Sequence, residues 1–189
     1  IGNSVTSIGN DAFGVCLSLT NVIIPNNVTT IGQAVFIMCR KLTSVTIGNG
    51  VTNMALEAFE SCSSLQRVYF AGDAPTINGS FPPFFGTAAT IYYLPGTIGW
   101  SSPFADVTAV LWNPQILTGN EMFGVRTNQF GFTISATNNI PVAVQACTNL
   151  AAPNWITVTN LTCGADGTVQ FTDPATANQP HRYYRFYPE

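Results

Sequence analysis

Apolar positions recur every 23 residues from the start of the chain, through three copies of one pattern. The segment that begins at Ile1 returns at Ile24 and again at Ile47. The columns in register with it are Val5/Val28/Val51, Ile8/Ile31/Met54, Phe13/Phe36/Phe59, Cys16/Cys39/Cys62, Leu19/Leu42/Leu65 and Val22/Val45/Val68. A fixed period of this length predicts a solenoid, in which each coil covers the apolar side of the next.

Around the end of each period six residues alternate, as a strand with one buried face does, which predicts strands at 19–24, 42–47 and 65–70. Stacked coils would place these strands in a parallel sheet, about 4.8 Å apart. We expect a second short strand at 5–8 and its copies, and a single helical turn at 11–16. The side chains expected on the outward, concave face are a candidate ligand-binding surface: Asn21, Ile23, Ser44, Thr46, Arg67 and Tyr69.

The period blurs after Phe70, and an aromatic-rich stretch follows that includes Trp100. Terminal coils of solenoids are atypical because one side meets solvent, so residues 70–112 are expected to cap the array. The pattern lapses over 113–122, which predicts a linker. Short strands separated by turn signals fill 123–189, and the Asp166-Gly167 pair indicates a hairpin.

The expected fold is therefore mainly β: a short solenoid with a parallel sheet and an aromatic cap at 1–112, a linker at 113–122, and a small antiparallel β-sandwich at 123–189.

Charge is scarce along the whole chain. Charged residues make up 8% of it, against roughly 25% in ordinary soluble domains. The net charge of -3 leaves no basic footprint for nucleic acid and no polybasic patch for anionic membrane. No apolar run approaches the roughly 18 to 20 residues that a membrane-spanning helix needs, so we expect no membrane insertion.

The five cysteines fall into two groups. Cys16, Cys39 and Cys62 share one column and are interpreted as buried thiols, with a metal site or a vicinal disulfide as alternatives, because spacings of 23 residues match no zinc pattern. Cys147 and Cys163 lie at similar places on successive strands of the C-terminal region. A disulfide between them is predicted, provided that the compartment is oxidising.

Residues able to carry catalysis are few. His181 is the only histidine, it follows Gln179-Pro180 in a turn, and no Gly-x-Ser-x-Gly elbow accompanies it. Glu57 and Glu60 share one turn and do not face each other across a cleft. We therefore predict no enzyme activity, no metal and no cofactor.

Aromatic side chains are the better candidates for binding, since exposed tyrosine and tryptophan can stack on sugar rings or fill a partner's pocket. Tyr69 beside Arg67 is the first candidate. On the last strand Tyr183 and Tyr187 alternate with Tyr184 and Phe186, so one of these two sets is expected to be exposed. Three glycosylation sequons begin at Asn27, Asn78 and Asn160 and are left open.

The string Val-Thr-x-Ile-Gly-x-x-Ala-Phe-x-x-Cys-x-x-Leu-Thr-x-Val-x-Ile, read from Val5 and less perfectly from Val28, resembles the BspA-like leucine-rich repeats of bacterial surface proteins over about the first 70 residues. Residues 92–100 resemble the end-cap segment of secreted planctomycete- and verrucomicrobia-type proteins, and 123–189 resemble a C-terminal β module of those proteins. The resemblance implies an extracellular or cell-surface, non-catalytic protein used for adhesion, binding or surface structure.

The chain opens at a repeat boundary, either because it is a processed form or because it is a fragment. As a mature start, its first coil would present five apolar side chains to solvent: Ile1, Val5, Ile8, Phe13 and Leu19. A second copy covering them would give head-to-tail growth into a filament or surface layer. The alternatives are an adhesin module that binds a surface protein or glycan, and an accessory module of a secreted hydrolase.

Overall fold

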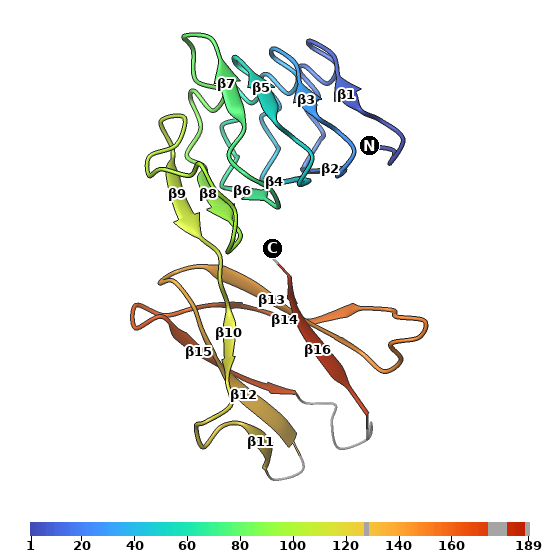
Figure 1. Cartoon of the computed structure of the whole chain (residues 1–189), viewed down its shortest axis with the longest axis vertical. Helices are drawn as coiled ribbons and strands as arrows, with labels where there is room; N and C mark the ends of the chain where they lie inside the picture. Colours follow the sequence, from blue (N-terminus) through green and yellow to red (C-terminus); the bar gives the residue numbers. More distant parts are fainter. Residues whose placement is uncertain (127–128, 174–180, 188–189) are drawn as a thin grey trace. The chain divides into compact units, whose positions relative to one another are not determined.

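A computed structural model describes residues 1–126, 129–173 and 181–187, and these residues contain strands and turns but no helix. The chain divides into two compact units, residues 1–111 and residues 112–189, called here the solenoid unit and the C-terminal unit. Figure 1 labels the strands of both units.

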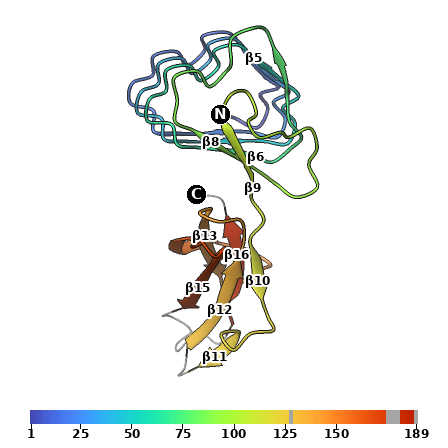
Figure 2. The same cartoon turned by 90° about the vertical axis from the view of Figure 1, so that its left-hand side faces the viewer.

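The solenoid unit contains two parallel sheets, so the predicted solenoid of parallel strands is confirmed. The coils lie behind one another when viewed along their axis in Figure 2. One sheet has the order β1 (Ser7–Ile8), β3 (Thr30–Ile31), β5 (Asn53–Ala55), β7 (Thr76–Asn78). The other has the order β2 (Asn21–Ile24), β4 (Ser44–Ile47), β6 (Arg67–Phe70), β8 (Thr90–Tyr93), β9 (Thr108–Leu111).

The strand register places each residue against its copy one coil away, as with Val22, Val45 and Val68. All three of these side chains are buried. The phenylalanine column forms a stack of rings with centroids 5.1 to 5.4 Å apart: Phe13, Phe36, Phe59 and Phe84. Phe84 follows Phe59 by 25 residues instead of 23. The stack therefore continues into a fourth coil. The strands of this coil keep the 23-residue spacing, since Thr76 pairs with Asn53 and Thr90 with Arg67, and only the phenylalanine is displaced by two residues.

The third side of each coil is not the helical turn that the sequence predicts. Backbone N–H groups here donate to the next coil, as Phe13 donates to Val35 and Phe36 to Ala58. A helical turn would instead direct these bonds within one coil. The turns contain non-glycine residues in the left-handed region, with φ between 54° and 60°: Asp11, Val15, Ala34, Met38, Glu57 and Ser61.

Aromatic rings cluster at the β8–β9 end of the solenoid unit. The ring of Trp100 contacts Phe70, Tyr93 and Phe104, with centroids 4.8 to 5.2 Å apart. The β9 strand then adds a fifth strand in parallel to β8. These rings extend the buried core of the coils beyond the Phe84 coil.

The C-terminal unit has two antiparallel sheets, as predicted for this region. In one, β12 (Gln129–Ser135) pairs with β10 (Gln115–Leu117), β11 (Gly124–Arg126) and β15 (Thr168–Asp173). In the other, β13 (Pro141–Cys147) lies between β14 (Ile156–Thr162) and β16 (Tyr183–Tyr187). Phe132 of the first sheet contacts Tyr184 and Phe186 of the second.

Two local expectations for this unit are wrong. The stretch 113–122, expected as a linker, contains β10, which pairs with β12. Its Ile116 and Leu117 are exposed, so backbone hydrogen bonds rather than an apolar face hold the strand in place. The Asp166-Gly167 turn connects β14 to β15, which belong to different sheets, so it does not close a hairpin. A turn signal specifies the turn but not the strands that pair.

Candidate functional site

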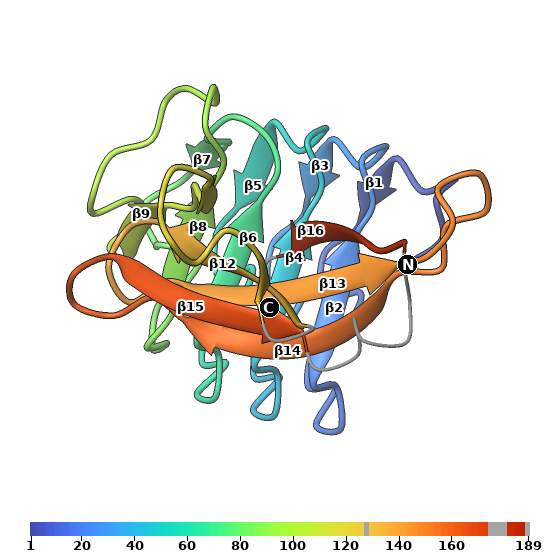
Figure 3. The same cartoon turned by 90° about the horizontal axis from the view of Figure 1, so that it is seen from below.

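The six side chains predicted for the outward face of the solenoid lie in two adjacent rows on β2, β4 and β6. One row is Asn21, Ser44 and Arg67, and the other is Ile23, Thr46 and Tyr69. These strands run side by side in Figure 3. Ile23 is 59% exposed, which is unusual for an aliphatic residue inside a strand.

Tyr69 differs from the expectation of an open aromatic side chain. It is only 4% exposed, and its ring stacks on Tyr92 with centroids 5.1 Å apart. Burial raises the pKa of Tyr92, while the nearby charge of Arg67 acts in the opposite direction. This end of the face is therefore packed, and the exposed part lies on β2 and β4.

A groove of about 460 Å³ lies where β2 and β4 end. Ile23 and Thr46, both on the predicted face, line it together with asparagines of the following corner and main-chain segments: Asn3, Ile24, Pro25, Asn26, Asn27, Gly48 and Ala71. Sequence reasoning missed the asparagines, although the column Asn3, Asn26 and Asn49 repeats at the 23-residue period. None of the residues that line the groove is charged or aromatic.

The corner asparagines hold the groove in shape. The Asn27 side chain donates to the carbonyl oxygen of Asn3 at 2.7 Å, and the Asn26 side chain accepts from the backbone N–H of Asn49 at 3.1 Å. Gly48 permits the close approach of successive coils, because a Cβ there would lie 2.6 Å from the backbone nitrogen of Asn26. Each coil thus fixes the corner of the next.

The five residues predicted for assembly have different environments. Ile1 is exposed, and Val5, Phe13 and Leu19 are partly buried against the core. Ile8, expected to face solvent, is buried instead, because it pairs with Ile31 and packs with the apolar core of the next coil. Only part of this set is therefore accessible.

Two of the three cysteines in the column, Cys39 and Cys62, are buried thiols as their spacing indicates, whereas Cys16 is only partly buried. The Cys39 thiol donates to the carbonyl oxygen of Phe13 at 3.2 Å, and the Cys62 thiol donates to that of Phe36 at 3.1 Å. Burial raises the pKa of Cys62 to about 12, so this thiol stays protonated at neutral pH. Among the described residues, no group of three histidine, cysteine or acidic side chains could hold a metal ion.

The predicted disulfide between Cys147 and Cys163 is wrong. All five cysteines are free thiols. Cys163 exchanges backbone hydrogen bonds with Asn139 and Ile140 at the start of β13, whereas Cys147 lies at the end of that strand. Seven residues of strand separate Ile140 from Cys147, so the two cysteines are on the order of 20 Å apart. A disulfide requires Cα atoms within about 7 Å.

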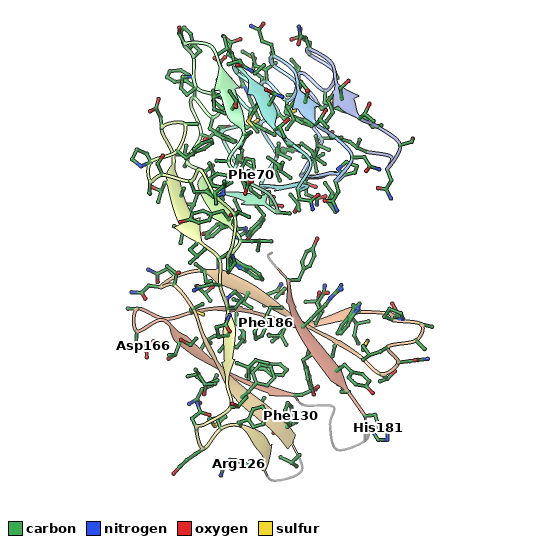
Figure 4. The ribbon with its side chains drawn as sticks, in the orientation of Figure 1. Phe70, Arg126, Phe130, Asp166, His181 and Phe186 are labelled. Atoms are coloured by element: carbon green, nitrogen blue, oxygen red, sulfur yellow. The ribbon has the colours of Figure 1, made fainter. Side chains whose placement is uncertain are left out.

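The candidate catalytic residues do not converge. His181 is exposed and lies apart from Asp166 in Figure 4. Asp166 accepts hydrogen bonds from Thr168, which lower its pKa. Glu57 accepts from Gln33 at 3.1 Å on the solenoid unit. These contacts are those of turn and surface residues.

Asp173, at the end of β15, is fully buried. Its carboxylate lies 2.9 Å from Arg182 Nη1 and accepts a hydrogen bond from the Tyr184 hydroxyl at 2.8 Å. This bond and burial raise the pKa of Tyr184, burial having the larger effect. No pattern in the sequence indicates this cluster.

The stacked coils, parallel strands and phenylalanine column define a leucine-rich-repeat solenoid. A family model described as "BspA type Leucine rich repeat region" matches residues 1–97 in six copies, and the chain belongs to this family. Members of the family are commonly surface proteins. The match ends at residue 97, so it gives no support to the resemblance noted for residues 123–189.

No curated protein and no solved structure matches the chain. Among the described residues, none forms a helix of the length and apolarity that crossing a bilayer requires.

Proposed function

We propose that the protein is a non-catalytic binding protein of the cell surface or extracellular space, and that its solenoid binds an uncharged segment of a partner protein. The observation that carries this proposal is the groove at the ends of β2 and β4. It combines an exposed aliphatic side chain, Ile23, with the Thr46 hydroxyl and the amides of Asn3, Asn26 and Asn27.

The lining of the groove favours a peptide over other ligands. Asparagine and threonine side chains can pair with the N–H and carbonyl groups of an extended backbone. Ile23 offers apolar contact to a side chain of the partner. A groove without charged side chains has no means of compensating a charged ligand, and one without aromatic rings lacks the surface on which sugars stack.

An array of defined peptides, probed with the 189-residue protein, tests the proposal. The Ile23→Asp variant places an unpaired charge in the groove. The matched control is Thr108→Asp, at the exposed first residue of β9 in the same sheet. We expect Ile23→Asp to weaken binding of the selected peptides by about tenfold or more, with Thr108→Asp unchanged. Failure of every peptide to bind, or equal loss in both variants, would refute the proposal.

Head-to-tail assembly into a filament or surface layer is the second candidate. It is supported by the partial exposure of Val5, Phe13 and Leu19, whose copies in the next coil are fully buried. Because any coil that precedes Ile1 would cover the same surface, its test is sedimentation of the whole natural protein. Concentration-dependent growth beyond a dimer supports assembly, and a monomer at high concentration contradicts it.

We further propose that the cluster around Trp100 caps the solenoid and that the two sheets of the C-terminal unit form a β-sandwich. The ring contacts of Trp100 and those between Phe132 and Phe186 support these two assignments. A role as an accessory module of a hydrolase draws no support from the described residues.

A further inference from the structure

The strand β16 presents two tyrosines on the outer face of its sheet. Tyr184 and Phe186 point inward, where their rings contact Phe132. Since side chains alternate along a strand, Tyr183, Arg185 and Tyr187 project from the opposite face. Tyr183 is 44% exposed and Tyr187 is 37% exposed. Figure 4 shows the inward direction of Phe186.

The neighbouring strand β13 places a small side chain beside each tyrosine. Tyr183 pairs with Cys147, and Tyr187 pairs with Ala143. Both partners have small side chains and both are almost fully buried. Paired residues on adjacent strands point to the same face, so each tyrosine stands above a small neighbour. Neither partner projects beyond its tyrosine, so the rings are the exposed part of this face.

Between the two tyrosines, a fixed row of polar side chains crosses all three strands. Arg185 lies over the ring of Trp155, with its guanidinium carbon 4.5 Å from the ring centroid, and its Nε donates to Gln145 at 2.9 Å. Gln145 in turn donates to the Thr157 hydroxyl at 3.3 Å. These contacts hold Arg185 in one orientation before any ligand arrives, and the row contains no carboxylate.

A pocket of about 200 Å³ lies at the Tyr183 end of the same sheet. Cys147, Asn149, Asn154 and Arg182 contribute to its lining. The Arg182 side chain is 5% exposed, and its Nη1 is paired with Asp173. Its Nε is buried and has no hydrogen-bond partner among the described residues. A buried donor left unpaired is costly, but Arg182 shares its partner Asp173 with the inward-pointing Tyr184, so this pocket lies beside the outer face and is not part of it.

We infer that this outer face, made of Trp155, Tyr183, Arg185 and Tyr187 with Gln145 and Thr157, is a binding site for a neutral polysaccharide. Tyr183 and Tyr187 are four residues apart on one strand, a separation of about 13 Å. Two rings at this spacing can stack on two pyranose units of the same chain, and the polar row between them hydrogen-bonds the intervening hydroxyl groups.

The order of side chains on the face favours this ligand over a protein partner. Tyrosine, tryptophan and arginine are enriched in protein interfaces too, but the core of such an interface is more apolar than the rest of the surface. Here the centre is occupied by Arg185, Gln145 and Thr157, with the Trp155 ring against Arg185, and Tyr183 and Tyr187 stand at the two ends. That order, ring, polar row, ring, matches a ligand that itself alternates flat apolar faces with hydroxyl groups.

The site is tested by affinity electrophoresis of the 189-residue protein in gels that contain one soluble polysaccharide each. The probes are laminarin, hydroxyethyl cellulose and galactomannan as neutral polymers, with alginate as the anionic one. We expect retardation by at least one neutral polymer. Tyr183→Ala and Tyr187→Ala should each weaken this binding by about tenfold, whereas Tyr187→Phe, which keeps the ring, should retain most of it.

Two controls separate this site from other effects. Val125→Ala alters an exposed residue of the other sheet, and Ile23→Asp alters the solenoid groove. Both should bind the neutral polymer as the wild type does, so failure of the solenoid proposal would leave this result intact. Circular dichroism and the melting temperature identify any variant that fails to fold, and Tyr187→Phe remains informative in that case.

The proposal is overturned if no neutral polymer retards the protein, or if both alanine variants bind as the wild type does. Retardation by alginate alone, abolished by salt, would mean that the charge of Arg185 binds anions without ring stacking. Selection of peptides that depend on Tyr183 and Tyr187 would assign the face to a protein partner, which also contradicts the proposal.

Discussion

The two units differ in how far apart along the chain their contacting residues lie. In the solenoid unit, each buried residue contacts its own copy one period away, as Phe36 contacts Phe13 and Phe59. In the C-terminal unit, the contacts join unrelated positions, as Phe132 contacts Phe171 and Phe186. Because the contacts repeat, the buried positions of the solenoid can be predicted from the sequence. The same repetition places similar apolar side chains in every coil.

The distribution of polar chemistry follows the same division. The solenoid core contains apolar side chains and protonated thiols, and its recognisable site lies at a corner where asparagines repeat. The C-terminal unit buries an ion pair, Asp173 with Arg182, and fixes an arginine over a tryptophan. Contacts between residues that are not copies of one another thus allow the C-terminal unit to bury and orient charged groups. A repeat of identical coils does not provide such contacts.

The largest expected effect is on the ring stack of the solenoid. Phe59→Ala removes a fully buried ring with neighbours on both sides, so we expect a loss of about 3 to 5 kcal/mol in the free energy of unfolding. Phe81→Ala is the matched control, since Phe81 is exposed and contacts Phe85 at its edge. Denaturant unfolding followed by circular dichroism measures both, and an equal loss would contradict the stacked core.

The corresponding change in the C-terminal unit is Asp173→Ala. It leaves the buried Arg182 charge unpaired and removes the acceptor of the Tyr184 hydroxyl, at an expected cost of about 3 to 5 kcal/mol. The double variant Asp173→Leu with Arg182→Met removes both charges and should recover most of this loss. If the double variant is no more stable than the single one, the ion pair is not the cause.

Thiol chemistry tests the cysteine assignments. The raised pKa of Cys62 keeps this thiol protonated and slow to alkylate in the native protein at neutral pH. In denaturant without reductant, mass spectrometry should find all five cysteines alkylated. Modification of three, with two protected as a pair, would restore the disulfide between Cys147 and Cys163.

The Cys62 thiol also makes the free energy of unfolding depend on pH. Its pKa rises from 9.0 to about 12 on folding. The stabilisation linked to the protonated thiol is therefore complete below pH 9, and it is lost as the pH rises from 9 towards 12. Replacing Cys62 by alanine should flatten that part of the profile, whereas an unchanged slope would assign it to other groups.

The smallest expected effect concerns the left-handed turns. Ser61 has φ of 56°, a conformation that costs a residue with a side chain roughly 1 to 2 kcal/mol and costs glycine little. Ser61→Gly should therefore stabilise the solenoid by about 0.5 to 1 kcal/mol, net of the entropy that glycine loses. Ser63→Gly, at an exposed neighbouring position, should not stabilise it. Urea titration compares the two.

Much of the solenoid could be predicted from the sequence because its contacts repeat with the period. The strand positions and buried columns follow from that rule. Phe84 does not follow the rule because it lies two residues beyond the expected position, although the strands on either side of it keep the period. The left-handed turns could not be predicted because their hydrogen bonds run between coils. The corner asparagines were visible as a column, but nothing in the sequence shows that they border a groove.

Less of the C-terminal unit could be predicted, because strand alternation shows where a strand lies and not which strand it pairs with. The disulfide prediction is wrong for this reason. Cys147 and Cys163 occupy similar places on successive strands of the sequence, but the antiparallel β13–β14 register places them at opposite ends of the pair. Alternation along β16 shows that either Tyr183 and Tyr187 or Tyr184 and Phe186 are exposed, but not which pair. Only the pairing with β13 and the contacts of Phe132 decide between them.

The most direct test of the proposed binding role is hydrogen–deuterium exchange of the 189-residue protein, with and without a peptide selected on the array. Binding in the groove predicts slower exchange in the corner segments 23–27 and 46–49, with the C-terminal unit unchanged. Protection confined to other segments, or no protection at saturating peptide, would contradict binding by the solenoid groove.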